Sequence, residues 1–188
     1  MELFYIQQII AGESSRFSYF INTYKDFAFS IAVRIVSNPE DAEEIVQDAF
    51  LKAYTSLNQF RGKSKFSTWF YRIVVNIALN KARKKLVPTY ELDTVELPEY
   101  LVANMEDTYR NFTQTERVKY VHLGLQRLKW EDALILTLYY LDEHTVGEIA
   151  EITAISPDNV KMQLHRARKK MYLVLSEILK TETINLLP

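Results

Sequence analysis

A cluster of basic and aromatic side chains in residues 60–85 is the most distinctive chemical feature of the sequence. The stretch contains no acidic residue, and its positive charges are those of Arg61, Lys63, Lys65, Arg72, Lys81, Arg83, Lys84 and Lys85. Aromatic rings lie among these charges. Because lysine and arginine neutralise phosphates and rings stack on unpaired bases, the stretch predicts a nucleic-acid surface; the alternative is a solvated basic helix.

Helical spacing divides this stretch into two faces. Trp69, Ile73 and Ile77 recur at the spacing of a buried face, and we assign Trp69 mainly to the core. Three polar side chains fall near one other face, at i, i+4 and i+8, and we expect them to hydrogen-bond bases or the sugar-phosphate backbone: Arg72, Asn76 and Asn80.

The turn of residues 61–66 comes directly before this helix and contains Gly62. We expect Phe66 or a neighbour to hold a base that has rotated out of the stack. Unstacking costs a few kcal/mol, which stacking and phosphate contacts offset. The basic stretch therefore predicts strand opening as well as binding.

A second nucleic-acid signal lies near the C-terminus. Thr145 and Glu148 have the spacing of a capping box, and Ser156-Pro157 is typical of another helix start. The short turn between these helices predicts a helix-turn-helix, although Ala154 stands where glycine is common, and a positive φ there would cost about 1 kcal/mol. The second helix has an apolar stripe and a basic face, which suits the major groove; the alternative is a helical hairpin with a solvated basic face.

Acidic residues gather on the helix before the basic stretch. Asp41, Glu44, Gln47 and Asp48 form a solvent-facing patch that suits a basic partner helix, or else a solvated helix start. A metal-dependent nuclease using such carboxylates is disfavoured, because acids from one helix cannot enclose an ion alone. His122, His144 and His165 have no partner spacing, so we predict neither enzyme activity nor a cofactor or metal site.

Helical periodicity and breaking residues divide the chain into two all-α units. Helices are expected over residues 3–11, 14–36, from 39 to about 60, and 67–86, then over residues 113–128, 130–141, 145–153 and 156–180. Prolines and acidic residues interrupt the pattern between the units. We expect domains at residues 1–86 and 112–188, joined by an acidic linker at residues 87–111.

Composition is consistent with a globular protein. The chain has 188 residues, 48% of them hydrophobic, and a net charge of −1 that hides the separation of acidic and basic segments. It has no cysteine, which excludes disulfides and thiolate metal sites. No apolar run approaches the roughly 20 residues that span a bilayer, so a cytoplasmic protein without a membrane span is expected.

Three segments together resemble the extracytoplasmic-function (ECF) sigma factors, two-domain members of the bacterial RNA polymerase sigma factor family. They are NPEDAEEIVQDAFLKAY at residues 38–54, FRGKSKFSTWFYRIVVN at residues 60–76, and IAEITAISPDNVKMQLHRARKK at residues 149–170. The resemblance implies that residues 1–86 are sigma region 2 and residues 112–188 are sigma region 4.

The resemblance also implies partners and residue roles. Region 2 would bind the β′ coiled coil of core RNA polymerase through Asp41, Glu44, Gln47 and Asp48. It would bind and melt the minus-ten element through Arg61, Lys63, Lys65, Phe66, Arg72, Asn76, Asn80, Lys81, Arg83 and Lys84. Region 4 would contact the β flap and read the minus-thirty-five element through Ser156, Asn159, Lys161, Met162, Gln163, His165, Arg166, Arg168 and Lys169.

An anti-sigma factor is a further partner implied by the resemblance. The function implied is a sigma factor that directs core RNA polymerase to specific promoters and assists melting of promoter DNA. A self-sufficient helix-turn-helix regulator is the alternative. That alternative explains the C-terminal unit equally well, but it does not explain a second basic aromatic surface in the first unit.

Overall fold

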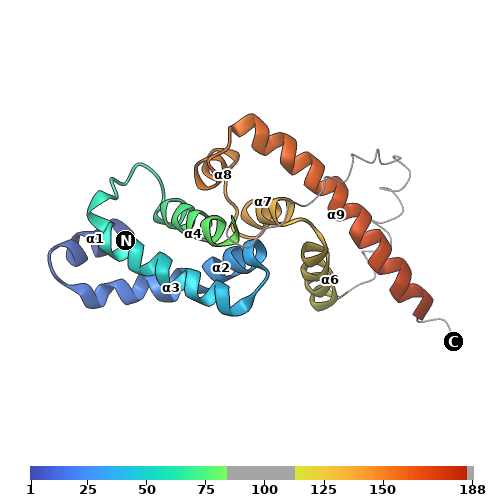
Figure 1. Cartoon of the computed structure of the whole chain (residues 1–188), viewed down its shortest axis with the longest axis horizontal. Coiled ribbons are helices and arrows are strands. Elements are labelled where there is room, and N and C mark those ends of the chain that lie inside the picture. Colours follow the sequence, from blue (N-terminus) through green and yellow to red (C-terminus); the bar gives the residue numbers. More distant parts are fainter. Residues whose placement is uncertain (84–112, 186–188) are drawn as a thin grey trace.

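The computed structural model describes residues 1–83 and 113–185, and these residues contain helices and no strands. The first unit consists of α1 (Glu2–Ile10), the 3₁₀ turn η1 (Ser14–Arg16), α2 (Phe17–Val36), α3 (Pro39–Thr55), the 3₁₀ turn η2 (Leu57–Gln59) and α4 (Phe66–Arg83). The second consists of α6 (Gln114–Arg127), α7 (Trp130–Tyr140), α8 (Val146–Thr153) and α9 (Pro157–Asn185) (Figure 1). The predicted all-α fold is confirmed, and the expected linker at residues 87–111 lies outside the described residues.

Local signals explain where the helices begin and end. Asn38 Oδ1 accepts a hydrogen bond from the Asp41 amide at 2.7 Å, and Pro39 opens α3. The Thr145–Glu148 capping box at α8 is confirmed, and a second capping box joins Thr113 to Glu116 at α6. Each box satisfies amide groups that would otherwise lack partners at a helix start.

The core of the first unit lies between α2, α3 and α4, which pack against one another. Its large side chains are mainly aromatic. The ring centres of Phe20 and Phe66 are 4.2 Å apart, and those of Phe50 and Phe70 are 4.5 Å apart. In the second unit, α7 is central, since every residue from Asp132 to Leu138 is buried. A helix that is apolar nearly all round belongs inside a fold, and α7 packs against both α9 and α2.

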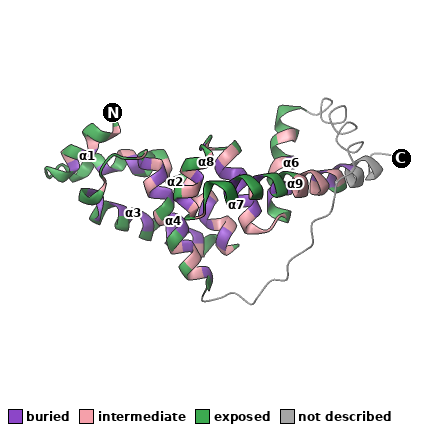
Figure 2. Ribbon diagram, turned by 90° about the horizontal axis from the view of Figure 1, so that it is seen from above, coloured by how far each residue is buried: buried purple, intermediate pink, exposed green. Residues whose placement is uncertain are grey.

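The two units share one continuous core, because α8 packs against α4 while α7 packs against α2. Figure 2 shows the buried residues of these four helices on their inward sides. The long helix α9 extends away from the first unit and holds α6 and α7 on its own inner face (Figure 1). This arrangement places the basic helix α4 beside the first helix of the helix-turn-helix.

Candidate nucleic-acid interface

The outer face of α4 carries the polar residues predicted to contact DNA. Arg72, Asn76 and Asn80 are all exposed, and Arg83 at the end of the helix is exposed as well. The opposite face contains Phe70, which is fully buried. One face of α4 therefore packs into the core while the other presents a polar strip, as the helical spacing predicted.

The loop before α4 adds positive charge to this strip. Arg61, Lys63 and Lys65 are exposed, and Gly62 turns the chain with a φ of 65° that favours glycine. Lys84 lies outside the described residues. The loop and α4 together present basic and amide groups of the kinds that hold phosphates and bases.

The expectation that Phe66 holds a flipped base is wrong for this structure. The side chain is 1% exposed and belongs to the aromatic core. The centre of its ring lies 4.2 Å from the ring centre of Phe20 and 5.4 Å from that of Tyr24. A ring enclosed in this way has no free face for a base. Trp69, assigned mainly to the core, is half-buried against Phe60 and Phe66.

Lys81 connects the predicted DNA surface with the predicted polymerase surface. Its ammonium lies 2.7 Å from a Glu44 carboxylate oxygen and 3.1 Å from Asp41, both on α3. The hydrogen bond to Glu44, followed by that to Asp41, raises the pKa of Lys81. Glu44, Gln47 and Asp48 are exposed along α3, whereas Asp41 is only partly exposed, so most of the acidic patch faces solvent.

The helix-turn-helix is formed by α8 and α9. Ala154 ends α8 with φ 58° and ψ 31°, so the left-handed conformation expected at this position is present without glycine. The Ser156 hydroxyl accepts a hydrogen bond from the Asn159 amide at 3.3 Å, which makes it the cap of α9. The short turn thus sets the angle at which α9 leaves α8.

The predicted recognition residues lie on the outer part of α9. Met162 is 52% exposed. Gln163 and Lys169 are half-buried, whereas the others are exposed: Ser156, Asn159, Lys161, His165, Arg166 and Arg168. The Arg168 guanidinium lies 5.5 Å from the ring centres of both Tyr139 and Tyr140, so its position is fixed by α7.

Contacts between the two units involve residues that the sequence gave no reason to pair. Lys65 in the basic loop lies 2.9 Å from Glu148 of α8, and the Ser64 hydroxyl donates a hydrogen bond to Glu151 at 3.1 Å. Burial acts to raise the pKa of Glu148, but the Thr145 amide and Lys65 outweigh it and hold the pKa at about 2. The helix-turn-helix is therefore anchored to the loop predicted to bind DNA.

A buried histidine completes this contact. His144 is 3% exposed, and its ring lies edge-on to that of Tyr71 from α4, with 5.7 Å between centres. Its Nε2 atom lies 2.7 Å from an Asp142 carboxylate oxygen. Sequence spacing could not identify this site, because its members come from separate helices and loops.

Comparison with known proteins identifies the family. The Sigma-70 region 2 model matches residues 20–86, and the Sigma-70 region 4 model matches residues 119–171. The ECF RNA polymerase sigma factor SigW of Bacillus subtilis (strain 168) is 32% identical over 173 residues, which cover 88% of this chain and 92% of SigW. The chain belongs to the ECF sigma factor family. The ECF RNA polymerase sigma-E factor of Escherichia coli (strain K12) is 28% identical to this sigma factor, over 87% of this chain and 88% of its own.

Solved structures share the fold of this sigma factor. CnrH in complex with the cytosolic domain of CnrY superposes with a TM-score of 0.64 at 18% identity, over 93% of this chain and 96% of CnrH. The sigma factor RpoE of Bartonella quintana, in complex with the anti-sigma factor NepR, gives a TM-score of 0.62 at 16% identity, over 85% of this chain and 96% of its own.

Two further features bear on the chemistry of this sigma factor. Within residues 1–83 and 113–185, no group of three or more histidine, aspartate or glutamate side chains is arranged to hold a metal ion. Across the same part of the chain, every helix is too short or too polar to cross a bilayer.

Proposed function

We propose that this sigma factor binds core RNA polymerase, directs it to specific promoters, and uses the exposed face of α4 to help open the DNA. The observation that carries the proposal is the exposed strip of Arg72, Asn76 and Asn80, on a helix whose opposite face is buried and beside an exposed basic loop. Its task is binding rather than catalysis, and it acts in the cytoplasm, where polymerase and promoter meet.

The strip and loop suit the minus-ten element because they combine two kinds of contact. Arg61, Lys63 and Lys65 are exposed cations that neutralise phosphates. The amides of Asn76 and Asn80 carry both donors and acceptors, so they can hydrogen-bond base edges that become available only after the strands part. Such contacts favour the open promoter over the duplex.

Helix α9 suits the minus-thirty-five element. Its start at Pro157 is capped by Ser156, and three exposed residues, Lys161, His165 and Arg166, follow within three turns together with the half-buried Gln163. Residues near the start of a recognition helix reach base edges, while later basic residues contact phosphates. Ser156 serves the helix as its cap, so we assign it a supporting part in this surface.

The acidic face of α3 suits the β′ coiled coil of core polymerase. Glu44, Gln47 and Asp48 are exposed on one side of the helix. Complementary charge guides association and sets the register of two helices. Lys81 holds Glu44 from the neighbouring helix, and we therefore assign Lys81 to positioning this face as well as to DNA. The β flap is the corresponding partner of region 4.

Promoter binding requires the two units to separate. The elements are named for positions about 25 base pairs apart, which at a rise of about 3.4 Å amounts to roughly 85 Å of duplex. In this structure the loop before α4 and helix α8 are in direct contact, as the 2.9 Å between Lys65 and Glu148 demonstrates. The packed arrangement is thus a resting form, which polymerase binding opens.

An anti-sigma factor is the proposed regulator. The two structures with similar folds, CnrH and RpoE, were both solved with a second protein, and NepR is named as an anti-sigma factor. Such a partner would act by stabilising a form in which region 2 and region 4 cannot reach their promoter elements together.

Run-off transcription tests this proposal against the alternative of a self-sufficient regulator. The chain is added to core polymerase over a library of promoters, and its DNA binding is measured with and without polymerase. Transcription and specific binding that both depend on core polymerase are expected. Tight operator binding by the chain alone, with no stimulation of transcription, would support the regulator instead.

A further inference from the structure

The start of α9 presents one large apolar side chain to solvent, that of Met162, which is 52% exposed. The other exposed residues that follow Pro157 in the first three turns are polar or charged: Asp158, Asn159, Lys161, His165 and Arg166. Helix α6 packs on the later part of α9, where Gly124 adjoins Met171 and Leu175, and the first turns of α9 lie beside α8 at the other end (Figure 1). The outer face of these first turns is therefore open to a DNA groove.

Helical geometry places Met162 opposite the buried side of α9. The buried stripe of this segment consists of Val160, Leu164 and Ala167. At 3.6 residues per turn, Met162 lies about 170° around the helix from the middle of that stripe. Among the side chains of the first three turns, it is the one nearest the centre of the outer face. Its thioether would lead the helix into the groove.

The charges around Met162 indicate which part of the DNA this face suits. Asp158 precedes it by one turn on the same face, has a side chain 89% exposed, and lies 3.2 Å from the Lys161 ammonium. Phosphates repel a carboxylate, whereas the amino group of cytosine can donate to it in the major groove. Lys161 and Arg166 stand on opposite flanks of this line. The centre of the face thus suits base edges, and its flanks suit the two phosphate backbones.

Thymine is the base that a methionine at this position can recognise. Its C5-methyl group is an apolar feature of the major groove that the other bases lack. The methionine side chain is flexible and apolar, so it can pack on that methyl group. Opposite a cytosine, the same side chain would cover the amino group without accepting its hydrogen bond, which carries a penalty. Single exposed apolar residues are common on protein surfaces, so the central place of Met162 among groove-facing residues is the decisive feature.

We propose that Met162 reads the C5-methyl group of one thymine in the minus-thirty-five element. The inference rests on the proposed function of α9 as the reader of that element. Met162 is then a specificity-determining residue, because its contact favours thymine at one position of one strand. The polar residues around it supply the remaining contacts to bases and phosphates.

Replacement of thymine by deoxyuridine tests the contact, because deoxyuridine keeps every hydrogen-bonding atom of the base and lacks only the methyl group. Wild-type holoenzyme first selects its upstream element from a promoter library. Each thymine of that element, on either strand, is then replaced singly in a duplex promoter, and affinity is measured by competition. We expect one position at which loss of the methyl group weakens binding about fourfold.

Variants of the helix assign that methyl group to its partner. Met162→Ala should bind the thymine promoter at least about fourfold more weakly than wild type and should no longer distinguish it from the deoxyuridine promoter. Met162→Leu keeps a large apolar side chain and should retain most of the distinction. Lys161→Ala is the matched control from the same turn: it should weaken binding to both promoters and leave their ratio near fourfold.

Two sets of results would contradict the account in different ways. Met162 is not the reader if Met162→Ala distinguishes thymine from deoxyuridine as wild type does, or if wild type has no methyl-sensitive position. Weaker binding by Lys161→Ala and Arg166→Ala would in that case still support α9 as the reading helix. If neither of these variants changes binding that depends on the minus-thirty-five element, the proposed function of α9 fails as well.

Discussion

Holding the two units together should abolish transcription from promoters that have both elements. The chain contains no cysteine, so Ser64→Cys and Glu151→Cys introduce the only two thiols. The side-chain oxygens of Ser64 and Glu151 are 3.1 Å apart in this structure. A short bismaleimide crosslinker with a cleavable disulfide can therefore join the basic loop to α8 without moving either helix.

The expected loss follows from the distances involved. A crosslinked pair cannot separate beyond the length of its short linker, whereas the promoter elements demand roughly 85 Å of duplex between the regions. No adjustment of side chains covers that difference. Run-off transcription with core polymerase should thus fall in proportion to the crosslinked fraction.

In the protein that lacks the crosslink, the ion pair between the units opposes separation only weakly, and the core shared by α2, α4, α7 and α8 is the larger contact that polymerase binding must replace. The Lys65 side chain is 63% exposed, so its ion pair with Glu148 contributes at most about 1 kcal/mol. Cleavage of the crosslinker should consequently restore transcription, and each single-cysteine variant treated with the same reagent should remain active. Wild-type initiation by fully crosslinked protein would refute the requirement for separation.

Three further predictions concern the stability of the second unit and its contact with the first. Ala154→Gly should raise the free energy of unfolding by about 0.5–1 kcal/mol in urea titrations, because glycine relieves the positive φ at this turn; an unchanged midpoint would contradict the strain. Lys170→Met should lower the free energy of unfolding by roughly 1–3 kcal/mol, because the buried Asp132 carboxylate loses the ammonium that now lies 2.6 Å away. Adding Asp132→Asn to this variant should recover part of the lost stability. The pKa of Glu148 is lowered from 4.5 to about 2, so its stabilisation is fully present above about pH 4.5 and is lost as the pH falls toward 2. The stability difference between wild type and Glu148→Gln should shrink over that window. A pH-independent difference would argue against stabilisation by the ionised carboxylate, through its contacts with Thr145 and Lys65.

Helix boundaries could be predicted from sequence because their signals are local. Asn38-Pro39 and the Thr145–Glu148 capping box act within one turn, and both occur where the sequence places them. The outward position of Arg72, Asn76 and Asn80 also follows from spacing along a single helix. These features depend little on the rest of the fold.

The role of each aromatic ring could not be predicted in the same way. Apolar residues cover more than half the circumference of α4, so its periodicity is compatible with several choices of which residues face the core. The structure buries Phe66, Phe70 and Val74, whereas Trp69 and Ile73, expected in the core, are only half-buried. That choice is made by the rings of α2 and α3, which lie elsewhere in the sequence.

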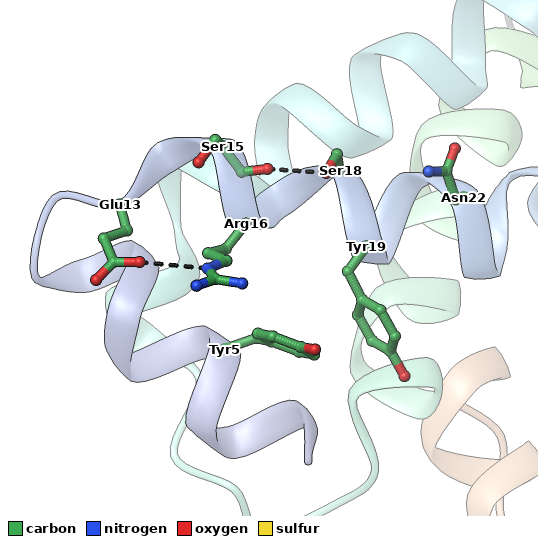
Figure 3. Close-up of a pocket in the computed structure, with 7 residues that line it drawn as sticks. All are labelled: Tyr5, Glu13, Ser15, Arg16, Ser18, Tyr19 and Asn22. Atoms are coloured by element: carbon green, nitrogen blue, oxygen red, sulfur yellow. Dashed lines mark hydrogen bonds and ion pairs between the residues drawn. The ribbon is translucent and has the colours of Figure 1, made fainter.

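The contact between the units depends on still more distant parts of the chain. Lys65 and Glu148 are each explained locally, as part of a basic loop and of a capping box, and neither pattern calls for the other. The neighbouring rings of Tyr5 and Tyr19 are a similar case, since they come together only when α1 folds back over α2 (Figure 3). Residues brought together by folding carry no spacing signal in a single sequence.

Permanganate footprinting of unpaired thymines tests most directly whether the outer face of α4 opens promoter DNA. Holoenzymes carrying Asn76→Ala and Asn80→Ala together are compared with wild type and with Asn58→Ala, an exposed asparagine of η2 outside the strip. With polymerase binding unchanged, the double variant should show at least about fivefold less thymine reactivity on duplex promoter, because each lost hydrogen bond costs about 1 kcal/mol. A pre-melted bubble should restore much of the loss. Normal opening of duplex promoter by the double variant would contradict the assignment of α4.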